Sequence, residues 1–152
     1  MLSSIAPSRL LLACCTLLLS TAALAAPPKE VIASADAPKA IGPYSQAIKS
    51  GPMLFLAGQI GLDPATGKLA DGGVEAQATR VLSNLQAVLA AGGMTTDNVI
   101  STTVYVKDLA DFGKVNAIYA TVFKDKTPAR ATVQVARLPL DALVEISAIA
   151  VQ

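Results

Sequence analysis

The chain lacks histidine, and its only two cysteines, Cys14 and Cys15, lie near the amino terminus. Beyond them there is no Cys or Ser/His nucleophile pair, no imidazole base and no zinc site of the usual type. An excess of charge of either sign is also lacking, since 12 Lys and Arg residues are balanced by 11 Asp and Glu residues, and no basic run occurs. This balance argues against nucleic acid as the partner.

Residues 1–25 have the pattern of a bacterial secretory signal. Arg9 gives a short, positively charged start, residues 10–19 form an apolar run, and Ala23-Leu24-Ala25 fits a signal-peptidase site. The apolar run is too short for a membrane-spanning helix, which needs about 20 residues. We expect cleavage after Ala25, which leaves residues 26–152 as one periplasmic domain without a thiol or a membrane anchor.

A lipoprotein signal is the competing interpretation of this segment. Leu11-Leu12-Ala13-Cys14 resembles a lipobox, with Cys14 as the modified residue. Only residues 10–13 would then separate Arg9 from Cys14, fewer than the roughly 7–15 apolar residues that a signal needs. The spacing therefore favours the cleaved, unmodified product.

Hydrophobic periodicity predicts five strands and two helices after an extended lead-in over residues 27–38. Apolar residues three or four apart predict a helix over 74–91, ended by Gly92-Gly93, and a second helix capped by Asp108 or Asp111. Alternating, β-branched or apolar runs predict the strands. These are residues 47–48, 53–57, 99–106, 131–135 and 144–148, the last two with a turn between them. In the third strand, one face is expected to carry Ile100, Thr102, Val104 and Val106.

The order strand-strand-helix-strand-helix-strand-strand predicts an α+β fold, a mixed sheet with two helices on one face. Several strands are apolar on both faces, residues 53–57 above all, and the composition is 53% hydrophobic with 15% charge. Such a sheet covers its second face with other subunits or with a long loop. The patterning favours an oligomer.

Two charged residues, Arg130 and Glu145, lie at or within the last two predicted strands. A guanidinium held just after Pro128 could bind a carboxylate in a two-pronged manner, or it could be a solvated or salt-bridged strand end. A carboxyl between Val144 and Ile146 could have a raised pKa and transfer protons, or it could face solvent.

Three further residues are candidates for the same site, each with an ordinary structural alternative. Asn116 interrupts the apolar stripe of the second helix and could bind a ligand or a backbone group. Tyr44 follows the stiff Gly42-Pro43 pair and could line a pocket or simply pack. Gly58 permits close approach to a ligand, or it only ends a strand.

The residues 37–46, Ala-Pro-Lys-Ala-Ile-Gly-Pro-Tyr-Ser-Gln, resemble the opening motif of the RidA/YjgF family of enamine/imine deaminases. Further landmarks follow in family order over about residues 32–151. They are Gly58-Gln59-Ile60, Asn84-Leu85, Val115-Asn116 with Tyr119, Pro128-Ala129-Arg130, Leu138-Pro139 and Val144-Glu145-Ile146.

This resemblance implies a chorismate-mutase-like subunit in a homotrimer with clefts between subunits. It also implies hydrolysis of 2-aminoacrylate and related enamines or imines to a 2-oxo acid and ammonia, without a cofactor or metal. In that case Arg130 would bind the substrate carboxylate, and Glu145 would activate water or relay a proton. Tyr44 would line the cleft, Asn116 would support it, and the main chain near Gly58 would approach the ligand.

Two departures from the family pattern bear on the substrate. Many deaminating members have a cysteine two residues after the arginine, where this chain has Thr132, a substrate-contacting position whose hydroxyl is not a thiolate. The serine often found before the glycine is Ala57 here. These changes keep open an alternative function, a non-enzymatic periplasmic protein that binds small carboxylates or acts as a holdase chaperone.

Overall fold

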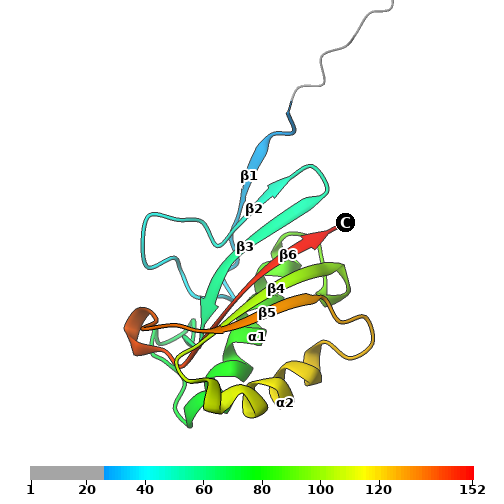
Figure 1. Ribbon diagram of the computed structural model, residues 1–152. Coiled ribbons are helices and arrows are strands. Elements are labelled where there is room, and N and C mark those ends of the chain that lie inside the picture. The colour runs from blue at the N-terminus through cyan, green and yellow to red at the C-terminus, as the bar shows by residue number, and fades with distance from the viewer. Residues whose placement is uncertain (1–25) are drawn as a thin grey trace, which may run out of the picture.

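The computed structural model describes residues 26–152, so the predicted signal segment and Cys14 lie outside the described residues. One six-stranded sheet carries two helices, which confirms the predicted α+β class (Figure 1). The strands are β1 (Lys29–Ile32), β2 (Ala47–Ser50), β3 (Met53–Ile60), β4 (Val99–Val106), β5 (Ala129–Gln134) and β6 (Val144–Val151). The helices are α1 (Gly73–Ala91) and α2 (Phe112–Val122), with short 3-10 turns η1 (Thr96–Asn98), η2 (Leu109–Asp111) and η3 (Pro139–Asp141).

The strand order is β1-β2-β3-β6-β4-β5, so the last strand of the chain lies inside the sheet and β5 lies at its edge. All neighbours are antiparallel except β4 and β5, which are parallel and connected through α2. A parallel pair needs such a crossover connection. Although β5 and β6 follow each other in sequence, β4 separates them in the sheet.

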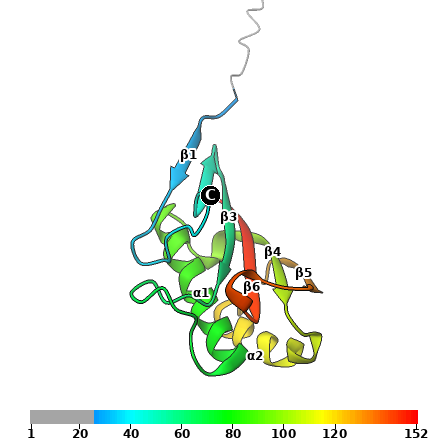
Figure 2. The same cartoon turned by 90° about the vertical axis from the view of Figure 1, so that its left-hand side faces the viewer.

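Both helices cover the same face of the sheet. α1 has the predicted apolar stripe, with Val81, Leu85 and Val88 almost fully buried, and α2 adds Val115 and Tyr119 to the same core. Figure 2, turned by 90°, shows α1 along one side of β3. Gly93, with φ of 74°, ends α1 in the left-handed conformation that glycine adopts most easily. No helix within residues 26–152 is long and apolar enough to cross a membrane.

The opposite face of the sheet remains partly apolar and exposed, as the sequence predicts. Phe55 and Val133 there are 41% and 42% exposed. A smaller cluster that includes Ile60, Leu138 and Ala142 covers one end of this face. The segment between β5 and β6 thus covers only that end, and oligomerisation over the remainder stays a prediction.

Three local predictions were wrong or incomplete. The lead-in contains a strand, β1, because Val31 and its neighbours pair with β2. Ile100 does not share the face of Thr102, because the register with β6 shifts between Val99 and Ser101 and leaves Ile100 52% exposed. Asp108 accepts a hydrogen bond from Ala110 N (2.8 Å) and caps η2, whereas the Asp111 side chain makes no cap bond to α2.

Candidate active site

Glu145 lies on the helix-free face of β6, next to the end of β3. It pairs across the sheet with Ile60 on one side and Tyr105 on the other. Its side chain is half-buried, and this burial raises the pKa of the Glu145 carboxyl above the usual glutamate value. Within residues 26–152 it forms no salt bridge. The carboxyl is therefore poised to hold a proton at higher pH than an exposed glutamate does.

The carboxyl borders a cavity of about 290 Å³, in which it is the one charged group. The other lining residues are Ile41, Tyr44, Ala57, Gly58, Ile60 and Pro139. The regular pairing of β3 with β6 breaks between Leu56 and Gln59, which places Ala57 and Gly58 in a bulge at this cavity. Ala57 therefore does line the cavity, where a serine would have added a hydroxyl.

Gly58 lines this cavity, as expected, and its lack of a side chain also makes room for Glu145. A Cβ atom built on Gly58 would overlap the Glu145 carboxylate and lie 2.7 Å from Cδ of that side chain. The space that a Gly58 side chain would need is thus occupied by Glu145, and approach of a ligand to the Gly58 main chain stays a prediction. The glycine is needed here because only a residue without a side chain lets the carboxyl rest against β3.

Tyr44 is placed by the loop between β1 and β2. Its hydroxyl accepts a hydrogen bond from Ile41 N (3.3 Å), and its ring, 48% exposed, lines the Glu145 cavity. The loop is anchored by the buried side chain of Gln46, which accepts a bond from Ser34 N (2.6 Å) and donates one to Pro38 O (2.7 Å). Gln46, in the opening motif, thus fixes the backbone that presents Tyr44.

Arg130 lies on the edge strand β5, on the face that the helices cover, because it pairs with the buried Thr102 of β4. Its guanidinium carbon is 4.6 Å from the ring centre of Tyr119 and 5.8 Å from that of Phe112, both on α2. Such cation–π contacts orient a guanidinium without neutralising it. Arg130 makes no salt bridge within residues 26–152, so its charge is available to an anion.

Asn116 and Arg130 line a second cavity, of about 450 Å³, with Tyr119, Phe123 and Pro128 among its other residues. Within the described residues the side-chain amide of Asn116 makes no hydrogen bond, so it has no backbone partner there. Thr132 shares the face of Arg130 on β5, because it pairs with Val104, but it is not among the lining residues.

The six sequence-predicted residues therefore fall into two groups in one subunit. Tyr44, Gly58 and Glu145 meet at one cavity, whereas Asn116 and Arg130 meet at another, with Thr132 nearby on β5. Arg130 and Glu145 are on opposite faces of the sheet and on strands that β4 separates. One subunit alone does not bring the guanidinium to the carboxyl.

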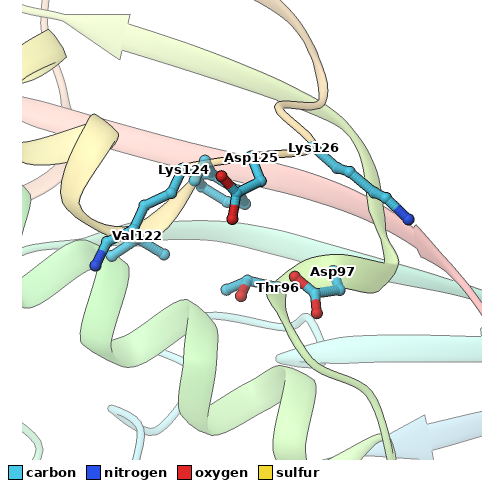
Figure 3. Close-up of a pocket in the computed structure, with 7 residues that line it drawn as sticks. Thr96, Asp97, Val122, Lys124, Asp125 and Lys126 are labelled. Atoms are coloured by element: carbon cyan, nitrogen blue, oxygen red, sulfur yellow. The ribbon is translucent and has the colours of Figure 1, made fainter.

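A third cavity, of about 340 Å³, lies between η1 and the loop after α2 (Figure 3). Its charged residues are Asp97, Lys124, Asp125 and Lys126, and their side chains point in different directions instead of converging. None of the predicted site residues lines it. In residues 26–152 there is also no group of three His, Cys, Asp or Glu side chains suited to a metal ion.

Several lining residues were missed by the sequence analysis. Ile41, Ile60 and Pro139 are apolar and carried no chemical signal, although all three belong to the quoted motifs. Tyr119 was named only as a landmark of the family pattern, without a role in the site, yet its ring supports Arg130. Burial raises the pKa of its hydroxyl, which shares a 2.8 Å hydrogen bond with Thr102.

Residues 34–152 match the model of the protein family described as Endoribonuclease L-PSP. A mouse protein named 2-iminobutanoate/2-iminopropanoate deaminase is 50% identical over 124 residues, 82% of this chain and 92% of the mouse protein. Some other relatives of about 50% identity, among them proteins of Pyrococcus horikoshii and Pyrococcus abyssi, are named only as RutC family proteins.

Solved structures agree with this match. The structure of the Escherichia coli YjgF gene product has a TM-score of 0.78 at 45% identity and covers 81% of this chain and 98% of its own. That of Escherichia coli TdcF with bound serine has a TM-score of 0.79 at 42% identity and covers 82% of this chain and 99% of its own.

Proposed function

Because the chain belongs to the Endoribonuclease L-PSP (RidA/YjgF) family, which includes imine deaminases, we propose that it hydrolyses enamines and imines of the 2-aminoacrylate and 2-iminopropanoate type to 2-oxo acids and ammonia. The observation that carries this proposal is the half-buried Glu145 carboxyl, the one charged group at a small apolar cavity. The serine held by the related Escherichia coli protein is itself a small α-amino carboxylate.

The proposed site is shared between subunits of a homotrimer, with Arg130 of one subunit facing the Glu145 cavity of the next. This is supported by the separation of the two residues within one subunit. It is also supported by the exposed position of β5 at the sheet edge and by the exposed Phe55 and Val133 on the helix-free face. Exposed apolar surface and an unpaired strand edge are both features that association covers.

The chemistry needs a carboxylate anchor and one group that gives and accepts protons. Arg130 holds the substrate carboxylate with its planar guanidinium, supported by Asn116. Protonated Glu145 donates its proton to the terminal carbon of the enamine, which becomes an iminium ion. The resulting carboxylate then accepts a proton from water as the water oxygen attacks the iminium carbon. The hydroxyl proton of the resulting carbinolamine passes to its nitrogen, the carbon–nitrogen bond breaks, and ammonia and the 2-oxo acid leave. Glu145 keeps the proton that it took from water and is ready for the next cycle.

A coupled assay tests the deaminase activity. A pyridoxal-phosphate lyase generates 2-aminoacrylate, and pyruvate formation is followed with the protein that begins at Ala26. We expect acceleration by the wild type, and loss of about 100-fold in kcat/KM in Arg130→Ala, because a charge-assisted anchor is removed. The exposed Arg137→Ala variant is the matched control and should keep full activity. If the wild type gives no acceleration, the deaminase proposal fails and the carboxylate-binding or holdase alternative takes its place.

Mixed oligomers test the shared site. Arg130→Ala and Glu145→Gln subunits are each expected to be inactive, and co-expression in equal amounts should restore about a quarter of the sites, because each site needs one intact residue from each of two subunits. Size-exclusion chromatography with light scattering gives the trimer mass. A mixture as inactive as its components would place both residues in the same subunit's site.

A nuclease activity, suggested by the family description, is tested in the same preparation. The near-neutral net charge and the lone carboxylate of the Glu145 cavity favour a small organic substrate over a phosphodiester. We expect no cleavage of single-stranded RNA under conditions of full deaminase activity. Cleavage that Glu145→Gln abolishes would support the nuclease instead.

Export to the periplasm is the proposed location, and it depends on residues 1–25 alone. Expression of the full chain in a bacterial host should give a periplasmic product whose amino-terminal sequence starts at Ala26. A lipid-modified product starting at Cys14, or a cytoplasmic full-length product, would contradict this proposal.

A further inference from the structure

Helix α1 carries two polar amide side chains on its buried face, Gln77 and Asn84. They are 7% and 0% exposed, among side chains that are otherwise apolar. Seven residues correspond to about two helical turns, so the two amides lie on the same stripe of the helix. Because burying an amide is unfavourable unless it makes hydrogen bonds, the partners of these two residues indicate what they do.

Asn84 binds the end of β3. Its Nδ2 atom donates to Ile60 O (3.2 Å) and to Leu62 O (2.9 Å). Ile60 O also accepts from Leu62 N (2.8 Å), so the chain turns tightly where β3 ends. The Oδ1 atom of Asn84 has no hydrogen-bond partner within the described residues. The two hydrogen bonds that Asn84 donates to the backbone are thus what offsets the cost of burying its side chain.

Gln77 binds the start of β6. Its Oε1 atom accepts a hydrogen bond from Leu143 N (2.8 Å), two residues before Glu145. The same side chain packs against Gly61, where an added Cβ would lie 2.8 Å from the Gln77 Cβ and 2.9 Å from its Cα. Gly61 therefore allows α1 to approach close enough to β3 for both amides to reach the backbone.

The two bound segments are the ones that flank Glu145. Ile60 is its partner on β3, and Leu143 lies immediately before the first residue of β6, two residues ahead of Glu145. Regular pairing between β3 and β6 is interrupted at Ala57 and Gly58, so the ladder alone fixes this region less firmly than it fixes the other end of the two strands. The side-chain amides of Gln77 and Asn84 supply hydrogen bonds to the two strand ends on the Glu145 side of this interruption.

We propose that Gln77 and Asn84 are positioning residues for Glu145: they fix the two strand ends beside it and so hold its carboxyl in the cavity against Gly58. The catalytic consequence rests on the proposed deaminase function, but the placement of the carboxyl does not. The other titratable groups near this carboxyl are the phenols of Tyr44, on the lining loop, and of Tyr105, on β4. Within one subunit no lysine or arginine lines the cavity, and in the proposed trimer Arg130 of the neighbouring subunit faces it in wild type and variant alike, so release of the carboxyl changes mainly its hydration.

Carbon-13 NMR of glutamate carboxyls tests the placement without any assay of activity. The chain has only three glutamates, Glu30, Glu75 and Glu145, and Glu145→Gln assigns the signal of interest. We expect the midpoint of the Glu145 pH titration to fall by about half a pH unit or more in Gln77→Met, because a carboxyl released from the cavity regains water. An unchanged midpoint in a folded variant overturns the proposal. If Gln77→Met does not fold, Gln77→Asn, which withdraws the acceptor by one methylene, is read in the same way.

Kinetics then separate positioning from folding. In Gln77→Met we expect kcat to fall about tenfold with KM nearly unchanged, because Arg130 still binds the substrate carboxylate. The control is Asn98→Leu, which removes an amide–backbone bond from Asn98 Nδ2 to Val151 O (3.0 Å) at the far end of β6, together with the bond that Asn98 Oδ1 accepts from Thr95 N (2.9 Å) at η1. It should lower Tm but leave kcat, KM and the pH profile unchanged. An equal loss of kcat in both variants, or no loss in Gln77→Met, would overturn the proposal. Inactive wild type would defeat the proposed function, while the NMR result still decides the placement.

Discussion

The two regions that carry the candidate chemistry are built in opposite ways. Glu145 is on an inner strand, half-buried, with its carboxyl against Gly58 and its backbone neighbours bound by α1. Arg130 is on the edge strand, exposed, and rests on the faces of two aromatic rings. A proton-transferring carboxyl gains from burial, whereas an anion-binding guanidinium must stay open to its ligand.

This contrast indicates that the Glu145 region depends on the core of its own subunit more than the Arg130 region does. Glu145 obtains its packing against Gly58 and the burial that raises its pKa from its own chain. Arg130 has its supporting rings but no carboxylate partner within the described residues. Substitutions in the first region should therefore change both proton transfer and stability, whereas those in the second should change mainly substrate binding.

The largest effect is expected for Glu145→Gln, which removes the proton donor but keeps the shape of the side chain. General acid–base catalysis contributes about 10²–10⁴-fold, so kcat should fall by about 1,000-fold in the pyruvate assay. Residual activity above one tenth of wild type would assign proton transfer to another group.

The same variant should change how stability depends on pH. Because the folded state raises the pKa of Glu145, the wild type loses stability as pH rises from the unfolded glutamate value through the folded one. Glu145→Gln should lack this decrease. Thermal unfolding of both proteins between acidic and neutral pH measures the difference, and parallel curves would contradict the pKa direction.

Gly58→Ala should have the next largest effect, because its Cβ would overlap the Glu145 carboxylate. We expect destabilisation by about 1–3 kcal/mol from overpacking. Displacement of the carboxyl by about 1 Å should lower kcat about 100-fold.

Gly113→Ala is the matched control for this substitution. Gly113 lies in α2 with nothing within 4 Å of an added Cβ. It should raise the free energy of unfolding by about 0.5–1 kcal/mol and leave activity unchanged. Urea unfolding with the pyruvate assay checks both variants, and equal behaviour of the two would remove the proposed role of Gly58.

Arg130→Lys should have a smaller effect that is confined to binding. The ammonium keeps the charge but loses the two-pronged geometry and the stacking over Tyr119. We expect KM to rise about tenfold with Tm unchanged, since β5 is an exposed edge strand. A drop in Tm like that of Gly58→Ala would show that Arg130 contributes to the core as well.

Tyr119→Phe should have the smallest effect on activity. It removes the 2.8 Å hydrogen bond to Thr102 but retains the ring under Arg130. Loss of this bond should cost about 1 kcal/mol of stability, with kcat/KM unchanged within about twofold. Thr102→Val removes the same bond, so a double-mutant cycle should give clearly non-additive losses. Additive losses would mean that the bond does not contribute.

Local patterning predicted most elements because it reports each segment's own periodicity. The stripe of α1 and the run of β4 came directly from the spacing of their apolar residues. Ile100 was placed on the wrong face because a register shift is decided by the partner strand, β6, and is not visible in β4 itself. β1 was missed for a related reason, since four residues become a strand only through pairing with β2.

By itself, the sequence determined the α+β class, the elements near Arg130 and Glu145, and the absence of imidazole and thiol chemistry beyond residue 15. Strand order was decided by the tertiary structure, because pairing between distant segments places β4 between β5 and β6. That order and the alternation of side chains put Arg130 and Glu145 on opposite faces, although fifteen residues or so separate them in the chain. The contact of Glu145 with Gly58 was decided in the same way, because it arises only where β3 and β6 meet at a bulge.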